Sequence, residues 1–446
     1  MVEADADAPV AMDPLGLPSA AFVRAAGECG AAADPARKAY RAVFRAGVRE
    51  VGLGRGVAVR AVVAPIVREL EEETGEGVIR KFVQRLAGEP SVGGADVRRT
   101  SALVSRSERL TSGTRGGAGA APARKPPVAR EIPHFDIESV LIPMIGRRGV
   151  RSHTLCVSSQ VGCAMGCGFC ETAQMGLVRS LTPAEIVGQW WAATHERGGT
   201  VKNIVFMGMG EPLDNVEAVI DAIAVLTDHN GPAIPMANIM VSTVGKIDGL
   251  RRLCEQMRVP GWHKLGIAIS INAPNDEIRS RIMPINRATP MAELREAIAA
   301  IPHVGTHKKI CFGYVLIPGV NDREEHASEL AGYLRPFTAG GSADGTHKGM
   351  LNLIPYNPRR ESPWPAPDEE HVERFLGWIR ERGVYAKRRR TKGRDTMAAC
   401  GQLGAEEIRK RRYVGVRIAD ESRAVASTED TAFHGERRLW PQIDTD

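Results

Sequence analysis

The hydrophobic pattern between residues 152 and 390 alternates short apolar runs with longer amphipathic stretches. The apolar runs have the length and composition of β-strands, and each is followed by a segment with helical spacing. The predicted strands are residues 152–159, 201–208, 238–245, 264–272, 309–317, 349–356 and 384–390. The first predicted crossover helix starts at a capping box formed by Thr182 and Glu185. This alternation predicts an α/β fold with parallel strands, either a full or partial (β/α) barrel or an open doubly wound sheet.

Helical spacing also precedes the strand region. It occurs in KAYRAVFRAGVREVG and in VRELEEETGEGVIRKFVQRLAG, so a small helical N-terminal module is predicted over residues 1–88. Residues 89–130 are rich in Gly, Ser, Ala, Pro and Arg and predict a flexible basic linker. Residues 131–412 are then predicted to form the barrel domain, and residues 413–446 a C-terminal tail.

Composition says more about the cellular location of the protein than about its function. No run approaches the roughly 20 apolar residues of a membrane helix, so we expect a cytoplasmic protein without a membrane partner. The net charge of +6 favours a polyanionic partner, although many basic proteins bind none. The chain has 8 cysteines but is not a small secreted chain, so reduced thiols and a metal site are expected rather than a disulfide framework.

Three of the cysteines lie close together on a glycine-rich segment. In VGCAMGCGFC, Cys163, Cys167 and Cys170 follow directly after the first strand of the barrel region. Three thiolates on one loop can hold three irons of a cubane cluster and leave the fourth iron open for a small molecule. The cysteines alone also allow a zinc site completed by Cys156, or a structural set of buried thiols.

A second segment of interest, MGMGEP, ends the next strand. Its glycines, Gly210 among them, allow a ligand to approach the backbone, and Glu211 offers an acceptor for an ammonium group. Taken alone, the segment is better interpreted as a plain tight turn.

The cysteine spacing, with the aromatic Phe169 before the last cysteine, resembles the radical S-adenosylmethionine superfamily. The segments TLCVSSQVGC, FMGMGEPL, APNDEIR, MPIN, NLIPYNP and AACGQL together resemble the RlmN/Cfr adenine methyltransferases, over residues 138–404. The resemblance implies a small helical N-terminal domain followed along the chain by a partial (β/α) barrel. It also implies one 4Fe-4S cluster on the three cysteines and two molecules of S-adenosylmethionine per turnover, as methyl donor and as radical source.

The resemblance also implies catalytic roles. Cys400, in AACGQL, corresponds to the cysteine that receives a methyl group and delivers it to the adenine as a methylene radical. Cys156 corresponds to the thiol that releases the product by forming a disulfide with Cys400, and Glu138 to a proton acceptor. Without the resemblance, Cys400 would be interpreted as a buried inert cysteine, and Glu138 as a surface carboxylate.

The cofactor pocket implied by the resemblance consists of residues that follow strands. These are Gly210, Glu211, Ser242, Ser270, Ile271, Asn272 and Asn357. The family usually has Ser-Leu-His where this chain has Ser-Ile-Asn, so an amide replaces an imidazole at Asn272. A hydrogen bond survives that change, but ring stacking and protonation do not.

The implied substrate is an adenosine in 23S rRNA, with tRNA as a second substrate, and the implied electron donor is flavodoxin or ferredoxin. The basic segments at residues 387–394 and 407–412 are expected to contact phosphates, or alternatively to be a solvated edge strand. An unpaired adenine is favoured, because a stacked base must be turned out to be reached. A monomer is the default expectation.

Two branches of the family differ in the methylated position. GMGEP and NLIPYNP favour carbon 2 of adenine, whereas VSTVG and PGVND are closer to the Cfr branch, which methylates carbon 8 of adenine in 23S rRNA. We expect carbon 2, with carbon 8 as the alternative. A radical enzyme with another substrate and a non-catalytic RNA-binding protein with a structural metal are the competing classes of function.

Overall fold

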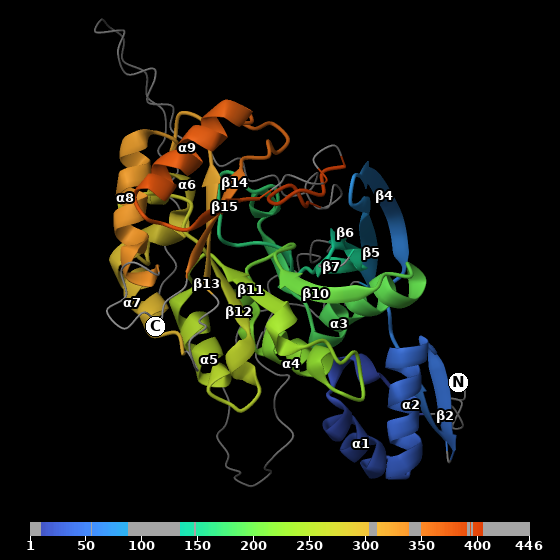
Figure 1. Ribbon diagram of the computed structural model, residues 1–446. Coiled ribbons are helices and arrows are strands. Elements are labelled where there is room, and N and C mark those ends of the chain that lie inside the picture. The colour runs from blue at the N-terminus through green and yellow to red at the C-terminus, as the bar shows by residue number, and fades with distance from the viewer. Residues whose placement is uncertain are drawn as a thin grey trace, which may run out of the picture.

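The computed structural model describes residues 10–54, 56–87, 134–146, 149–302, 310–338, 349–389, 393 and 396–404. A small N-terminal unit stands beside one large curved sheet that carries helices on its outer side (Figure 1). Within these residues, no helix is both long enough and apolar enough to cross a membrane.

The parallel part of the sheet contains all seven strands that the sequence pattern predicted. They are β7 (Arg151–Cys156), β10 (Val201–Phe206), β11 (Ile239–Thr243), β12 (Gly266–Ser270), β13 (Ile310–Leu316), β14 (Met350–Pro355) and β15 (Ala386–Arg388). Each pairs in parallel with the next, in the order β7, β10, β11, β12, β13, β14, β15. Because the described strands end in the two edges β15 and β4, the barrel is partial, as expected.

Crossover helices connect these strands. The α-helices are α3 (Pro183–Trp191), α4 (Val216–Thr227), α5 (Ile247–Met257), α6 (Asp276–Ile282), α7 (Met291–Ala299), α8 (Glu324–Leu334) and α9 (Glu369–Glu381). Helix α3 begins at the predicted capping box: Thr182 Oγ1 accepts from Glu185 N at 3.2 Å, and Glu185 Oε2 accepts from Thr182 N at 2.9 Å. Short 3-10 turns lie in the same region at Thr172–Met175, Pro212–Asn215, Met236–Asn238, Trp262–Lys264, Pro284–Arg287 and Arg335–Phe337, and a π-turn at Ala192–Glu196.

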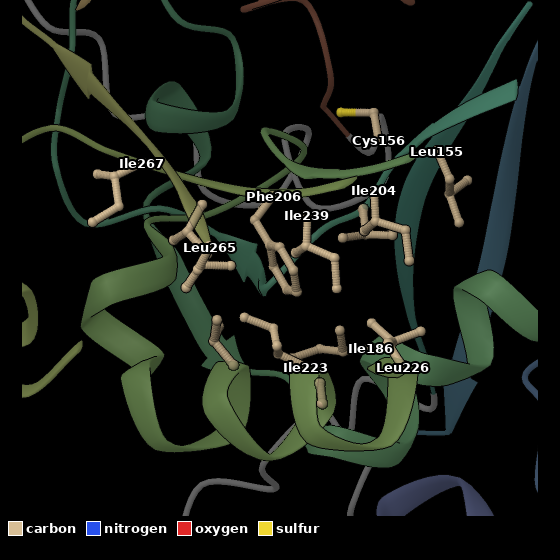
Figure 2. Close-up of a cluster of buried hydrophobic side chains, with 14 of the residues drawn as sticks. Leu155, Cys156, Ile186, Ile204, Phe206, Ile223, Leu226, Ile239, Leu265 and Ile267 are labelled. Carbon is tan, nitrogen blue, oxygen red and sulfur yellow. The ribbon is translucent and has the colours of Figure 1, made fainter. Parts of the chain in front are cut away.

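The core lies between the sheet and the helices. Ile204 and Phe206 of β10 pack against Ile223 and Leu226 of α4, and all four are fully buried (Figure 2). Figure 2 also shows Cys156 on the opposite side of the strands from these helices. Successive side chains of a strand point to opposite faces, so the residue after a core position faces the inside of the partial barrel.

The N-terminal module is helical only in its first half. It contains β1 (Val10–Met12), a 3-10 turn (Pro14–Gly16), α1 (Ser19–Glu28), α2 (Ala33–Ala46), β2 (Glu50–Gly54) and β3 (Val57–Arg60). The three strands form a small sheet in the order β1, β3, β2. The helix predicted in KAYRAVFRAGVREVG is confirmed up to Ala46 and ends where Gly47 adopts a left-handed conformation (φ +67°).

The predicted helix in VRELEEETGEGVIRKFVQRLAG is wrong. This segment forms a hairpin of β4 (Ile66–Thr74) and β5 (Gly77–Ala87), closed by the two residues Gly75 and Glu76. Apolar positions 79, 82, 83 and 86 fit helical spacing, yet β5 pairs with β6 (His134–Ile145), which in turn pairs with β7. Tertiary pairing therefore overrides a local helical pattern.

The hairpin also moves the domain boundary. β4, β5 and β6 extend the barrel sheet with antiparallel strands, so this sheet begins at Ile66 rather than after residue 131. The predicted linker (89–130), the C-terminal tail (413–446) and the basic segment 407–412 lie outside the described residues.

Candidate active site

The three-cysteine loop follows β8 (Gln160–Gly162), which pairs with β9 (Leu177–Ser180). Gly162 has φ +78°, and a Cβ there would stand 1.9 Å from Gly176 O, so only glycine fits. Cys163 N donates to Gly176 O at 3.0 Å, and Gly168 N donates to Ile282 O at 2.9 Å. The loop is thus held by backbone hydrogen bonds at its start and again between Cys167 and Cys170.

Burial dominates the chemistry of the three thiols. Cys163 and Cys167 are 8% and 4% exposed, and Cys170 is partly buried. Burial raises the pKa of all three thiols, and the neighbouring cysteines raise the pKa of Cys163 and Cys167 further. Buried thiols held this close together need a positive charge to ionise, which bound iron supplies.

The three cysteines line one cavity and offer the thiolate ligands that a cubane cluster needs. Among the described residues, no three His, Cys, Asp or Glu side chains converge closely enough to hold a single ion. Thiols that surround a cubane stand farther apart than ligands of one ion, because the irons and sulfides lie between them. Cys156 does not line the cavity of the three cysteines, so the zinc site that included Cys156 is not formed.

One cavity, here called the cluster cavity, collects most residues that the sequence singled out. Its wall includes Cys163, Cys167, Cys170, Gly210, Glu211, Ser242, Ser270, Asn272, Asn357 and Cys400. Among the predicted cofactor-pocket residues, Ile271 is the exception, because its side chain is fully buried in the core and does not line the cavity.

Glu211 is a buried carboxylate with oriented oxygens. Oε1 accepts from Leu213 N at 3.0 Å and Oε2 accepts from Val244 N at 3.0 Å. Burial raises the pKa of Glu211 to about 7, while these backbone donors and Thr243 oppose the rise. The side chain is 2% exposed, so it presents a fixed acceptor to an ammonium group in the cavity.

The glycines of MGMGEP are required by close packing. A Cβ on Gly208 would stand 2.6 Å from Val157 O, and one on Gly210, whose φ is +100°, would stand 2.6 Å from Gln160 Cβ. Gln160 Oε1 accepts from Glu211 N at 2.9 Å. The segment is therefore a tight turn that also positions Glu211, so the two interpretations of the sequence hold together.

Asn272 occupies a left-handed backbone position with φ +56°. Asparagine and histidine both tolerate this region better than most residues. Its Oδ1 accepts from Val315 N at 3.0 Å, and its carbonyl oxygen accepts from Asn321 Nδ2 at 2.8 Å. The amide thus ties the end of β12 to β13, a role that needs no imidazole.

Arg279, in the APNDEIR segment, links two strand ends. Its Nη2 donates to Val244 O at 2.7 Å and to Ser270 O at 3.3 Å, and its Nε donates to Ile271 O at 3.1 Å. The side chain is fully buried, and its charge opposes the rise in the pKa of the Cys167 thiol that burial causes. The APNDEIR motif by itself predicts no separate role for this arginine.

A second cavity adjoins the cluster cavity. Its wall includes Cys156 and four methionines, Met144, Met207, Met240 and Met350. Both cavities share Cys311, Asn357, Arg389 and Cys400, so Cys400 stands where the two meet. Cys156 and Cys400 are both free thiols, so the disulfide expected between them is not present.

Arg389 faces three thiols at this junction. The interaction with Cys400 raises the pKa of Arg389 most, and the interactions with Cys156 and Cys311 raise it further. Burial raises the pKa of Cys156 to about 12 and that of Cys311 to about 11, and Arg389 opposes both shifts. Cys311 and Arg389 were missed as site residues, because a lone cysteine in a strand and an arginine in a basic run carry no sequence signal.

In the described part of the basic run, Lys387, Arg388 and Arg389 do not share one face. Lys387 is exposed, but Arg388 forms ion pairs with Glu369 and Glu373 of α9. Arg389 faces the cavities instead. Residues 390–392, 394 and 395 lie outside the described residues.

Glu138 is not a surface carboxylate. Its side chain on β6 is 7% exposed and forms an ion pair of 3.0 Å with Lys81 Nζ of β5. Its Oε2 also accepts from Gly404 N at 2.9 Å. Glu138 lines neither of the two cavities.

Comparisons with known proteins agree with this architecture. Residues 157–331 match the family described as the Radical SAM superfamily. A probable dual-specificity RNA methyltransferase, RlmN 1, from Protochlamydia amoebophila is 42% identical over 284 residues, which cover 64% of this chain and 74% of that protein. A dual-specificity RNA methyltransferase RlmN from Alkalilimnicola ehrlichii is 41% identical over 280 residues, covering 62% of this chain and 72% of that protein.

A solved structure agrees as well. The crystal structure of a radical SAM methyltransferase from Sphaerobacter thermophilus matches with a TM-score of 0.65 and 30% sequence identity, over 89% of this chain and 99% of that one. The fold and cofactor class expected from the cysteine loop are thereby confirmed. The chain belongs to the RlmN family of radical S-adenosylmethionine RNA methyltransferases.

Proposed function

We propose that this chain methylates carbon 2 of an adenosine in 23S rRNA, and of one in tRNA, with Cys400 as the carrier of the methyl group. The observation that carries the proposal is the position of Cys400 on the shared wall of the two cavities. One cavity holds the three-cysteine loop and Glu211, and the other holds Cys156. A group carrier must face both its donor and its acceptor.

The cluster cavity is proposed to hold the 4Fe-4S cluster on Cys163, Cys167 and Cys170, with S-adenosylmethionine beside it. When bound, these groups supply the methyl group and the one-electron chemistry. Glu211 would accept a hydrogen bond from the ammonium of the methionine part. Ser242, Ser270, Asn272 and Asn357 offer polar atoms along the same wall, whereas Ile271 contributes only to the core.

The second cavity is proposed to receive the adenine. Methionine side chains give it flexible apolar walls, and a few polar groups, such as Asn352 and Asn357, are available to orient a base. Entry requires a base that is unpaired or turned out of its stack.

Cys156 is the proposed resolving thiol. Burial raises the pKa of Cys156 most, and the interaction with Cys400 raises it further, so the two sulfurs influence each other across the second cavity. A disulfide between them would form only transiently, when the product is released. Glu138 as a proton acceptor stays a prediction, because its carboxylate contacts Lys81 and Gly404 N in this structure.

The test is mass spectrometry of nucleosides from rRNA and tRNA after incubation with the cluster-loaded protein. We expect 2-methyladenosine, and no product from Cys400→Ala. Cys156→Ala should accumulate a covalent protein–RNA adduct. Cys254 is a buried thiol of α5 that lines neither cavity, so the control variant Cys254→Ala should retain activity. 8-Methyladenosine as the product would instead support the Cfr-type alternative and contradict the proposal.

The remaining partners follow from the same proposal. Flavodoxin or ferredoxin is the proposed electron donor, and a cytoplasmic monomer is the proposed state of the protein. Reduction of the cluster by each donor, followed by formation of 5′-deoxyadenosine, tests the first of these.

A further inference from the structure

The segment that carries Cys400 is held from both sides by the antiparallel strands. Lys81 Nζ of β5 donates to Met397 O at 3.0 Å, on the amino-terminal side of Cys400. Glu138 Oε2 of β6 accepts from Gly404 N at 2.9 Å, on the carboxyl-terminal side. Residues 396–404 are here called the Cys400 loop.

The two anchors are one electrostatic unit. Lys81 Nζ and Glu138 Oε2 lie 3.0 Å apart, and their side chains are only 6% and 7% exposed. Each charge is therefore satisfied by the other and by one backbone group of the Cys400 loop. A buried ion pair this costly to desolvate is weak evidence for stability, but it fixes geometry where both partners share additional hydrogen bonds.

Other contacts also hold the loop. From the three-cysteine segment, Glu171 N donates to Gly401 O at 2.7 Å and Thr172 Oγ1 donates to Leu403 O. Glu72 of β4 accepts from Gly393 N at 3.0 Å and from Thr396 Oγ1 at 3.3 Å, and Asn357 Nδ2 donates to Cys400 O at 3.4 Å. Met397 itself has φ +52°, an uncommon conformation for a residue with a Cβ. The Lys81 contact falls on the carbonyl of this strained residue.

We propose that Lys81 is a positioning residue, which acts through Met397 O and Glu138 to hold Cys400 at the junction of the two cavities. This inference rests on the proposed role of Cys400 as methyl carrier. It assigns the hairpin of β4 and β5 a function in catalysis, although neither Lys81 nor Glu138 lines a cavity.

Hydrogen–deuterium exchange of the full-length, cluster-loaded protein tests the anchoring directly. In Lys81→Met, amides of the Cys400 loop should exchange at least tenfold faster, while the helices of the barrel keep their protection. Arg80→Met is the matched control: Arg80 is the neighbouring residue of β5 and pairs with Glu71 and Glu69 on β4 instead. It should leave both loop exchange and activity unchanged.

A coupling ratio separates positioning from general damage. The amount of 5′-deoxyadenosine formed per methyladenosine should rise severalfold in Lys81→Met and fall back in Lys81→Arg, which keeps the charge and the donors. If the wild type forms no methyladenosine while the exchange contrast persists, the proposed function fails and the anchoring stands.

A double variant covers the case in which Lys81→Met leaves Glu138 unpaired and does not fold. Lys81→Met/Glu138→Met removes both buried charges with side chains of similar volume, so it should fold yet still exchange rapidly in the Cys400 loop. Unchanged loop exchange in either folded variant would overturn the proposal. Failure of both variants to fold would also overturn it, since the pair would then support the whole sheet rather than this loop.

Discussion

At the scale of single residues, Glu211 shows how the site balances burial against charge. Its two oxygens accept backbone hydrogen bonds from Leu213 and Val244, and these favour the carboxylate form. Burial outweighs them and raises the pKa of Glu211 to about 7. The group that would bind an ammonium is therefore half protonated near neutral pH.

This shift predicts pH-dependent cofactor binding. Because only the carboxylate accepts from an ammonium, affinity for S-adenosylmethionine should rise with pH through about 7. The competent fraction grows roughly tenfold between about pH 6 and pH 8 for a group with this pKa, and Kd falls by the same factor. Isothermal titration calorimetry on the cluster-loaded protein measures this Kd at each pH. Glu211→Gln should bind weakly and without that slope, and an equal slope in this variant would refute the assignment.

Arg389 gives a second prediction at this scale. Transfer of a methyl group to sulfur requires a thiolate, and the Arg389 guanidinium faces Cys400, Cys156 and Cys311. Arg389→Met should slow S-methylation of Cys400 about tenfold, equivalent to about 1.4 kcal/mol in the barrier. Mass spectrometry of the peptide containing Cys400 gives the rate. Lys387 is an exposed cation two residues away. The variant Lys387→Met should therefore methylate Cys400 at the wild-type rate.

At the scale of elements, turns after the strands decide where functional groups stand. Gly208 lies just after β10, where the chain passes the end of β7 so closely that a Cβ would stand 2.6 Å from Val157 O. Gly332 in α8 has no atom within 4 Å of its would-be Cβ and no positive φ. Gly208 therefore has no room for a side chain, whereas Gly332 has.

Alanine substitutions should separate them. Gly208→Ala should lower the free energy of unfolding by about 1–3 kcal/mol through overpacking and weaken binding of S-adenosylmethionine, since Glu211 is displaced. Gly332→Ala should raise it by about 0.5–1 kcal/mol, because alanine restricts the unfolded chain and suits a helix interior. Denaturant unfolding followed by circular dichroism compares the two. A stabilised Gly208→Ala variant would contradict the close approach.

At the scale of the whole molecule, the N-terminal module is attached on the side away from the cavities. Asp228 ends α4, and its carboxylate accepts from Ser19 N at 2.6 Å and Ser19 Oγ at 3.0 Å at the start of α1. Crossover helices run antiparallel to the strands, so the end of α4 lies near the amino ends of the strands. Trp191 Nε1 of α3 also donates to Val43 O of α2 at 3.0 Å.

Asp228→Ala should therefore loosen the module without affecting the site. We expect a loss of about 1–3 kcal/mol in the free energy of unfolding, because the buried donors of Ser19 lose a charged acceptor. Hydrogen exchange should accelerate in α1 and α2, while the Kd for S-adenosylmethionine stays unchanged. A weakened Kd would show that the module is coupled to the cavities.

Local sequence determined most of the barrel. Periodicity placed all seven parallel strands, the capping box placed the start of α3, and cysteine spacing identified the cofactor class. These features depend on neighbours within a few residues, so they can be inferred without the fold. The motif resemblance added Cys400 and Cys156 to the predicted site residues, and both line the second cavity.

Only the tertiary structure decided the long-range features. The segment at residues 66–87 has helical spacing but forms strands, because β6 offers it a pairing partner more than 45 residues away. Lys81 and Glu138 meet the Cys400 loop across about 260 residues or more of sequence. Arg388 and Arg389, adjacent in a uniform basic run, divide between surface ion pairs and the cavities. In each case the deciding partner is distant in sequence, and no local pattern encodes it.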